Sequence, residues 1–289
     1  YEVGIYKDFK PSQNIGSVSN KGIEFGITHN KTIGDFSYSV GFNMSKNWNK
    51  VTDLGASDPI YEDPWIKKVG YAIGTFYGFR TDGLLTQEDI DNGNYITDGI
   101  TPQAGDIKYV DLDGDGQITT NDREIVGYTD PKGYGGISTT LNYKNWTLNV
   151  IFNYVYGNDV FNRSYHEYTL GAGYGTLNMF NDELNRWSVN NTSGSIPRAH
   201  SNNLDRMLIS SRVMQDGSYL RMKNVTLNYQ FPLKWINKVG LSNLNLYVSG
   251  ENLLTWTGFK GADPESVGTG YDETYPNARS FTLGLNVSF

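Results

Sequence analysis

The chain has 289 residues, a formal net charge of -7 at pH 7, and no cysteine. The lack of cysteine excludes disulfide scaffolds and thiol catalysis, and the negative charge argues against nucleic acid as a partner. Hydrophobic residues make up only 38% of the chain while aromatics reach 14%, a mix that suits a barrel whose strands are apolar at alternate positions better than a soluble globular fold.

Alternation of apolar and polar residues predicts β-strands along most of the chain. The chain starts at Tyr1 without a methionine or a signal peptide, and residues 1–7 already alternate like a strand, so we expect a fragment whose N-terminal portion is missing or lies on another chain. Between Met222 and Val225 the apolar phase slips by one residue, which predicts a β-bulge. We expect roughly eight strands of about 9–13 residues, long enough to cross a bilayer when tilted. Clear examples are 23–27, 36–42, 146–156, 225–231, 244–248 and 281–289.

The links between the predicted strands alternate in length, as they do between the periplasmic and extracellular ends of bacterial barrels. If Phe289 is periplasmic, every long link lies outside the cell. Parity then allows zero or two spanning strands within 49–132. The run Tyr71–Arg80 either has a spanning partner near Asp106–Val110 or belongs to an extracellular ribbon. The short or moderate links are 30–35, 144–145 and 232–242, and the long ones are 49–132, 157–217 and 257–277.

A soluble β-sandwich would show the same alternation, because one face of each sheet would pack in a core. The predicted strands are longer than the roughly 5–6 residues usual in globular sheets. Aromatic residues also stand at strand ends, where a membrane barrel places its interfacial girdles. These features favour a membrane barrel; the aromatic residues are Trp146, Phe231, Trp256 and Phe289.

Residues 111–122, DLDGDGQITTND, have the pattern of a calcium-binding loop. Carboxylates occupy alternate positions at its start, a glycine follows where a sharp turn is needed, and an aspartate closes it. Calcium takes roughly six to eight hard oxygen ligands, and clustered carboxylates repel one another without a cation. The predicted ligands are Asp111, Asp113, Asp115, Gln117 (through its backbone carbonyl) and Asp122.

The closing Asp122 stands where a helical EF-hand has glutamate, so the loop is closer to a dockerin-type loop. We expect a structural Ca²⁺ that staples a long external loop, within a calcium-loop segment at 106–127. A weak site suffices at millimolar extracellular Ca²⁺. The alternative is an acidic surface turn without an ion.

Several segments together resemble the SusC/RagA family, the TonB-dependent outer-membrane transporters of Bacteroidota. They occur in the order of the family and cover essentially the whole chain. The segments are Asn20–Glu24, Gly105–Gly127, Tyr156–Asp159, Asp216–Asn224, Tyr247–Leu254, Asp263–Glu265, Tyr275–Pro276 and Arg279–Phe281.

This resemblance implies an all-β fold: the C-terminal part, roughly eight to ten strands, of an antiparallel transmembrane β-barrel of about 22 strands with long extracellular loops. It implies active import of oligosaccharides or peptides across the bacterial outer membrane, energised by TonB, with a SusD-like surface lipoprotein as a lid. The plug, the TonB-binding segment and the remainder of the barrel would lie outside this chain. The alternatives are a soluble calcium-stabilised carbohydrate-binding β-sandwich and a passive porin-like barrel.

We expect no enzymatic activity. The three histidines, His29, His166 and His200, are far apart and lack the spacing of metal ligands, and no serine lies in a nucleophile-elbow context. Asp263 and Glu265 are expected to form a turn with solvated charges.

Two further groups are weaker candidates for contact with a substrate or the lid. Segment 167–190 is expected to hold a short helix that packs inside an external loop. Inward-facing strand residues are candidates to line the lumen, although no substrate residue is assigned. The helix positions are Met179, Phe180, Leu184 and Trp187, and the lumen candidates are Tyr247, Asn245, Asn228 and Arg221.

Overall fold

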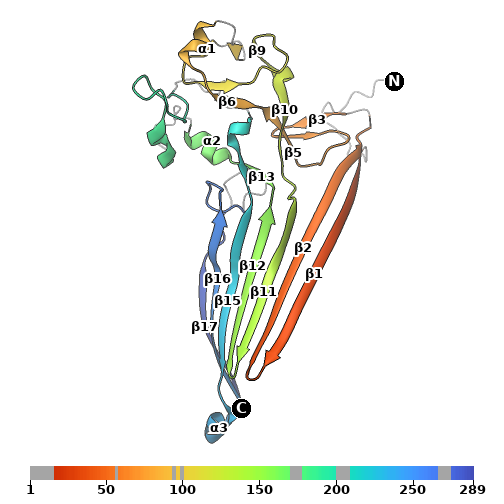
Figure 1. Ribbon diagram of the computed structural model, residues 1–289, viewed down its shortest axis with the longest axis vertical. Coiled ribbons are helices and arrows are strands. Elements are labelled where there is room, and N and C mark those ends of the chain that lie inside the picture. Colours follow the sequence, from red (N-terminus) through yellow and green to blue (C-terminus); the bar gives the residue numbers. More distant parts are fainter. Residues whose placement is uncertain are drawn as a thin grey trace, which may run out of the picture.

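A computed structural model shows one large sheet with a layer of smaller elements at one end of it (Figure 1). The strand predicted at 1–7 lies outside the described residues. The structure describes residues 16–55, 58–92, 96–97, 101–169, 178–199, 209–265 and 275–289.

The large sheet has seven strands in the described part of the chain, and all neighbours are antiparallel. Each of these seven strands pairs with the one that precedes or follows it along the chain, apart from the short strands within the long links, so the sheet is a simple meander. We call the face that carries the exposed hydrophobic side chains the apolar face and the opposite one the polar face. In order across the sheet the strands are β1 (Ser17–Ile33), β2 (Phe36–Asp53), β11 (Gly133–Tyr143), β12 (Trp146–Tyr156), β15 (Tyr219–Gln230), β16 (Asn243–Thr257) and β17 (Ser280–Ser288).

The three short links leave the sheet at the same end, the lower end in Figure 1. Gly34 and Asp35 form a two-residue turn in which Gly34 has a φ of +60°, a conformation that glycine adopts without a steric cost. Lys144 and Asn145 form the second turn. The third link contains α3 (Leu233–Ile236) and the 3-10 helix η4 (Asn237–Val239). We call this the short-turn end and the opposite one the long-loop end.

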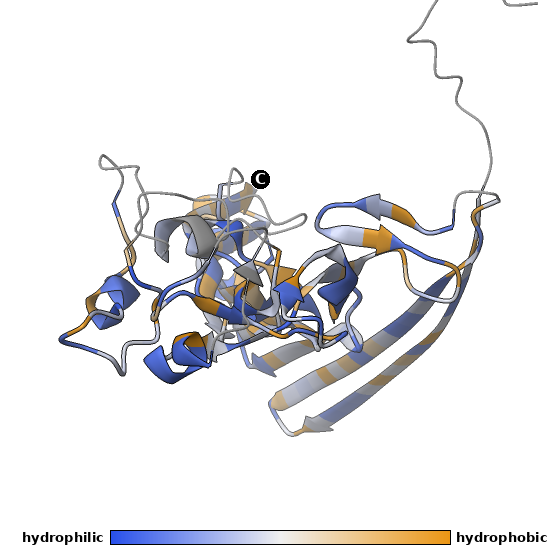
Figure 2. Ribbon diagram, turned by 90° about the horizontal axis from the view of Figure 1, so that it is seen from above, coloured by the Kyte–Doolittle hydropathy of each residue, from blue (hydrophilic) through white to orange (hydrophobic). Residues whose placement is uncertain are grey.

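Apolar side chains cover one face of the sheet and stay exposed. On β17 the exposed fractions of Phe281, Leu283 and Leu285 are 77%, 73% and 60%. Seen from above, the long strands β1 and β2 show hydrophobic and hydrophilic residues in alternation (Figure 2). Among the described residues no second sheet packs on the apolar face, so its burial needs a partner other than this chain. This arrangement favours a membrane barrel over a β-sandwich.

The predicted bulge is confirmed in β15. Ile151 pairs with Asn224 and Phe152 pairs with Met222, which leaves Lys223 as the extra residue. The register against β16 shifts at the same point. The bulge lets Leu220 and Met222 share the apolar face with Val225 despite the slipped phase.

The long-loop layer contains short strands and helices. Four strands form a sheet in the order β10 (Arg123–Tyr128), β5 (Thr75–Phe79), β4 (Trp65–Lys67) and β3 (Ile60–Glu62). The paired strands are β6 (Thr81–Leu84) with β8 (Ile107–Tyr109), β7 (Ile96–Thr97) with β9 (Gln117–Ile118), and β13 (Asp159–Phe161) with β14 (Met214–Asp216). The helices are α1 (Gln87–Asp91), α2 (Arg163–Thr169), and the 3-10 helices η1 (Thr120–Asp122), η2 (Asn181–Asn185) and η3 (Ser211–Val213).

The structure decides between the two possibilities left open for 49–132. Strand β2 pairs directly with β11, so this link contributes no strand to the large sheet. The predicted strand at Tyr71–Arg80 is β5, which belongs to the ribbon-like sheet of the long-loop layer. Its partner is β10, not the segment Asp106–Val110, because β8 pairs with β6 instead.

The short helix expected in 167–190 appears as a 3-10 helix, but its expected apolar stripe is not buried as one face. Helix α2 ends at Thr169, and the described residues beyond it form only the 3-10 helix η2. The expected apolar stripe does not pack as one face, because Leu184 is 90% exposed and Met179 is also exposed.

The long-loop layer holds the hydrophobic core of the described chain. One cluster joins Phe79, Ile107, Tyr109 and Ile118. Ile118 belongs to the loop 111–122, which we call the calcium-type loop, so this loop contributes to the core. A second joins Phe76, Phe161 and Val213 from two different long links. None of the helices in the described residues is long and apolar enough to cross a membrane.

Polar contacts also tie the three long links together. Arg198 binds Asp106 in a bidentate ion pair, with Nε–Oδ1 at 2.7 Å and Nη2–Oδ2 at 3.2 Å. Lys260 of the third long link reaches Asp182 of the second, Nζ–Oδ2 2.7 Å, and Tyr165 donates to the same carboxylate. The pKa of Asp182 is lowered, mainly by the hydrogen bond from Lys260. The layer is therefore one connected body.

We expect Gly284→Ala to destabilise the barrel. Tyr247 lies over Gly284 on the polar face, and an added Cβ would stand 2.1 Å from Cζ of that ring. Such overpacking costs about 1–3 kcal/mol. Chemical unfolding of the full-length protein in detergent measures the change. Gly26→Ala, also in a long strand but with no atom within 4 Å of its Cβ, is the control; an equal loss in both variants would contradict the prediction.

Candidate functional site

The calcium-type loop connects β8 to β10 in the long-loop layer. Ile118 anchors it in the hydrophobic cluster around Phe79, and β9 pairs in parallel with β7. Gly114 and Gly116 have φ angles of +76° and +81°, the left-handed conformation that glycine tolerates best. The glycine predicted at the sharp turn is thus required by the backbone, and the turn brings the aspartates on either side of it together.

Three of the predicted ligands form a group. Carboxylate oxygens of Asp111, Asp113 and Asp115 all lie within 4.8 Å of one another. Asp111 accepts hydrogen bonds from the backbone N–H groups of Gly114 and Gly116, each 2.7 Å, and these hold its pKa below the usual range. Three close anionic oxygens create a strongly negative spot that a hard cation would neutralise.

The other two predicted ligands take different places. Asp122 is fully buried and stands apart from that group of three: Oδ1 accepts the N–H of Leu112 (2.8 Å) and Oδ2 the N–H of Thr119 (2.7 Å). It therefore closes the loop by joining its start to its end. Gln117 has an exposed side chain, and its backbone N–H donates to Asp115 Oδ1 at 2.7 Å.

A buried ion-pair cluster ties the third long link to the sheet, and it corrects the expectation of a solvated Asp263–Glu265 turn. Arg221 on β15 is almost fully buried and pairs with Asp263 and, at 2.6 Å, with Glu265. Asp263 is itself only 3% exposed. One signal in the sequence could have indicated this cluster: an arginine inside a predicted strand needs an acidic partner if it is buried.

Further hydrogen bonds complete this cluster. Asp263 Oδ2 accepts the backbone N–H of Asn277 at 2.9 Å, and Oδ1 accepts that of Glu265 at 2.9 Å. Burial alone would raise the pKa of Asp263, but the Arg221 guanidinium and these N–H groups hold it below its usual value. Arg221 is thus fully used by this ion-pair cluster and is not available as a group that lines the lumen.

The remaining lumen candidates do share the polar face. Tyr247 pairs with Asn228 across β15 and β16, and Asn245 pairs with Gln230 next to them. The Asn245 amide donates to the Gln230 side chain at 3.5 Å, and the Tyr247 ring covers Gly284. These residues form part of a polar wall, and nothing in their geometry singles out a substrate.

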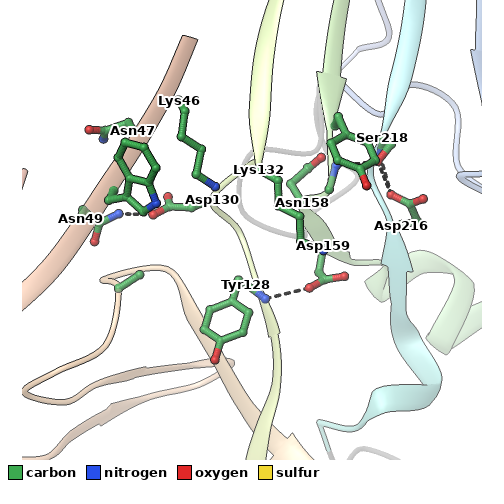
Figure 3. Close-up of a pocket in the computed structure, with 14 residues that line it drawn as sticks. Lys46, Asn47, Asn49, Tyr128, Asp130, Lys132, Asn158, Asp159, Asp216 and Ser218 are labelled. Carbon is green, nitrogen blue, oxygen red and sulfur yellow. Dashed lines mark hydrogen bonds between the residues drawn. The ribbon is translucent and has the colours of Figure 1, made fainter. Parts of the chain in front are cut away.

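A cavity of about 510 Å³ lies where the layer meets the long-loop end of the sheet (Figure 3). Its wall comes from β2, from the segment before β11, and from the ends of β12 and β14. Most of its polar groups bind one another: Asp159 accepts the N–H of Tyr128 at 2.9 Å, and Asn49 donates to Asp130. Burial raises the pKa of Asp130. The rings of Trp48 and Tyr156 at its wall are exposed.

A second cavity of about 520 Å³ adjoins the calcium-type loop. The rings of Tyr61 and Tyr77 lie 5.5 Å apart at its side, and Asn121 of η1 faces it. Arg123 packs over Phe79, and its buried Nε has no hydrogen-bond acceptor among the described residues. Aromatic rings beside such donors can bind sugars or peptides equally well.

The structure describes the backbone position of two of the three histidines. His29 is on β1 beside Tyr38, with ring centroids 5.6 Å apart. His166 belongs to α2, and His200 lies outside the described residues.

The sequence is similar over nearly its whole length to TonB-dependent receptors. It is 37% identical over 302 residues to TonB-dependent receptor P3 of Formosa agariphila, covering 96% of this chain and 29% of that protein. It is 29% identical over 312 residues to TonB-dependent receptor SusC of Bacteroides thetaiotaomicron, covering 99% of this chain and 28% of that protein. No family model matches the chain.

The fold is similar to that of a solved transporter. A structure of the RagAB peptide transporter superposes with a TM-score of 0.78 at 24% identity, covering 96% of this chain and 30% of that chain. The RagAB peptide importer in the open-open state gives a TM-score of 0.77.

The meandering sheet with links that alternate in length defines a portion of an outer-membrane β-barrel. Within that class, the chain belongs to the SusC/RagA family of TonB-dependent transporters, as its motifs indicated, and it fits the expected C-terminal barrel portion. It spans about 30% of the length of the relatives it matches. These relatives are named as receptors and transporters rather than enzymes, in agreement with the expectation from the sequence.

We expect Asp263→Asn to release the third long link. Removing one partner of a buried ion pair costs about 3–5 kcal/mol, and the low end applies here because Glu265 still pairs with Arg221. Limited proteolysis of the full-length protein should cleave 257–277 about a hundredfold faster, if cleavage follows local opening.

Glu265→Gln is the matched control. Its side chain is a third exposed, so the lost charge is better replaced by water and cleavage should rise far less. Equal cleavage rates in the two variants would contradict the buried-anchor interpretation.

Proposed function

We propose that this chain is the C-terminal barrel portion of an importer that brings oligosaccharides or peptides across the bacterial outer membrane, energised by TonB and closed by a SusD-like surface lipoprotein. The observation that carries the proposal is the sheet with one exposed apolar face and links of strictly alternating length, in a chain similar to SusC over 99% of its length. The plug, the TonB-binding segment and the remaining strands would come from outside the chain.

The proposal orients the protein in the membrane. Bacterial barrels place short turns in the periplasm and long loops outside the cell. The long-loop layer then faces the medium, where a lid lipoprotein and substrate would meet it. The exposed side chains of Leu184 and Val189, at 90% and 82%, suit a contact with such a lid.

Oligosaccharides and peptides are the two candidate substrate classes. RagAB is named as a peptide transporter, whereas the receptor names carry no substrate. Both cavities of the long-loop layer combine exposed aromatic rings with polar groups, which supports either class.

The proposed import is tested with the full-length protein in its native cells. Deleting the TonB-binding segment should abolish uptake of the substrate, because active import needs the energised inner membrane. A variant shortened elsewhere in the N-terminal region, with that segment kept, is the control. Uptake that persists without TonB would instead support the passive porin-like barrel.

We also propose that the loop 111–122 binds a structural Ca²⁺ through Asp111, Asp113 and Asp115, with the Gln117 carbonyl and Asp122 completing the donor set. The convergence of three carboxylates on a rigid turn supports this. Each oxygen of Asp122 accepts one hydrogen bond and keeps a second lone pair for a ligand. Bound Ca²⁺ would hold β9 and the Ile118 anchor in place.

Asp113→Asn should lower the thermal stability gained on adding Ca²⁺ to the full-length protein. Ca²⁺ stabilises the folded loop by mass action, and a lost carboxylate weakens its binding. Asp82→Asn, an exposed aspartate in the same layer, is the control. Because backbone N–H groups depress the pKa of Asp111, this one carboxylate stays charged until the pH falls below the ordinary carboxyl range. If Ca²⁺ does not raise the thermal stability of the wild-type protein, the loop is an acidic surface turn without an ion and the proposed site is wrong.

A further inference from the structure

The link between β15 and β16 presents an exposed apolar surface at the short-turn end. Leu233, Trp235 and Val239 are 60%, 58% and 71% exposed. Figure 1 shows α3 at the extremity of the molecule, below the strands and near the C-terminus. The other two short turns have two residues each, so among the described links at this end only this one extends beyond the sheet. Three large apolar side chains in water at this place need an explanation.

The fold holds this surface in a fixed position. Ile236 is buried, and its carbonyl accepts the backbone N–H of Leu241 at 3.2 Å. Gly240 ends η4 in the left-handed conformation, and Ser242 then donates to the carbonyl of Ser288 at 2.8 Å. The exposed side chains are therefore presented by a structured turn and not by a free loop.

The charge of the turn is entirely basic. Residues 231–243 contain Lys234 and Lys238 and no aspartate or glutamate, although the whole chain has a net charge of -7. Apolar side chains next to lysines are the composition of segments that lie in a membrane interface, where lysine meets lipid phosphates.

A row of aromatic rings continues from the sheet toward this turn. Trp146 and Tyr229 lie 4.6 Å apart between ring centroids, and Tyr229 and Phe231 lie 4.9 Å apart. Aromatic belts of this kind mark the level of the lipid headgroups. Phe231 immediately precedes the turn, so the exposed surface adjoins the belt.

We propose that α3 and η4 form an interfacial anchor. Leu233, Trp235 and Val239 would insert into the periplasmic leaflet of the outer membrane, while Lys234 and Lys238 bind phospholipid phosphates. The inference rests on the proposed outer-membrane orientation, which places the short-turn end in the periplasm.

The test uses the full-length receptor in vesicles of phosphatidylethanolamine and phosphatidylglycerol. This portion of the chain has no cysteine, so Val239→Cys provides a labelling position for a polarity-sensitive dye once any cysteine elsewhere is replaced by serine. We expect a blue-shifted emission that lipids with brominated acyl chains quench. Leu233→Cys should behave alike, whereas Asn237→Cys, exposed on the same turn but polar, should show neither change.

Two results would overturn the anchor. A blue shift without quenching would show that protein covers the turn, and a water-like emission without quenching would show that nothing does. Insertion of the barrel is followed separately by its heat-sensitive migration in gels. A wild-type receptor that cannot insert into vesicles would overturn the proposed function, and the anchor with it.

Discussion

The structure depends on a single constraint: the apolar face of the large sheet has no partner within the described chain. Leucine and phenylalanine side chains of β17 are exposed there, so water is the wrong solvent for this face. The hydrocarbon of a bilayer can cover this apolar face. Closure with further strands provides partners for the backbone hydrogen-bonding groups at the edge strands β1 and β17. The large sheet therefore depends on a partner outside this chain, whereas the hydrophobic packing within the described chain is concentrated in the long-loop layer.

The sheet could be predicted because its signal is local and repetitive. Alternation in β12 and β17, the two-residue turn at Lys144, and the slipped phase before Val225 each appear in the sequence as neighbouring residues. The family motifs add an order along the chain that alternation alone does not provide. The turn of the calcium-type loop could also be predicted, since its aspartates are close in sequence and Gly116 has the backbone conformation that the pattern requires.

The errors concern residues whose partners are distant in sequence. Asp263 binds Arg221, and a turn that looks solvated in isolation becomes a buried anchor. The two possibilities left open for β5 could not be decided from the sequence for the same reason, because its partner β10 follows a stretch containing a helix and four other strands. The helical spacing of apolar residues around Leu184 predicted one apolar face. Such a face is buried only where a neighbouring surface covers it, and Leu184 remains exposed.

The connected core of the long-loop layer has a consequence for biogenesis. In the proposed orientation, with the long loops outside the cell, the residues of this layer must cross the outer membrane before they reach their final place. A packed body held by the Phe76 cluster and the Arg198–Asp106 pair is wider than an extended chain, so it cannot form until its segments have crossed. Its pairings join residues far apart in sequence, and such contacts form slowly. Late folding of the long-loop layer is thus compatible with export. The membrane-spanning strands can insert and pair into a barrel before that layer folds.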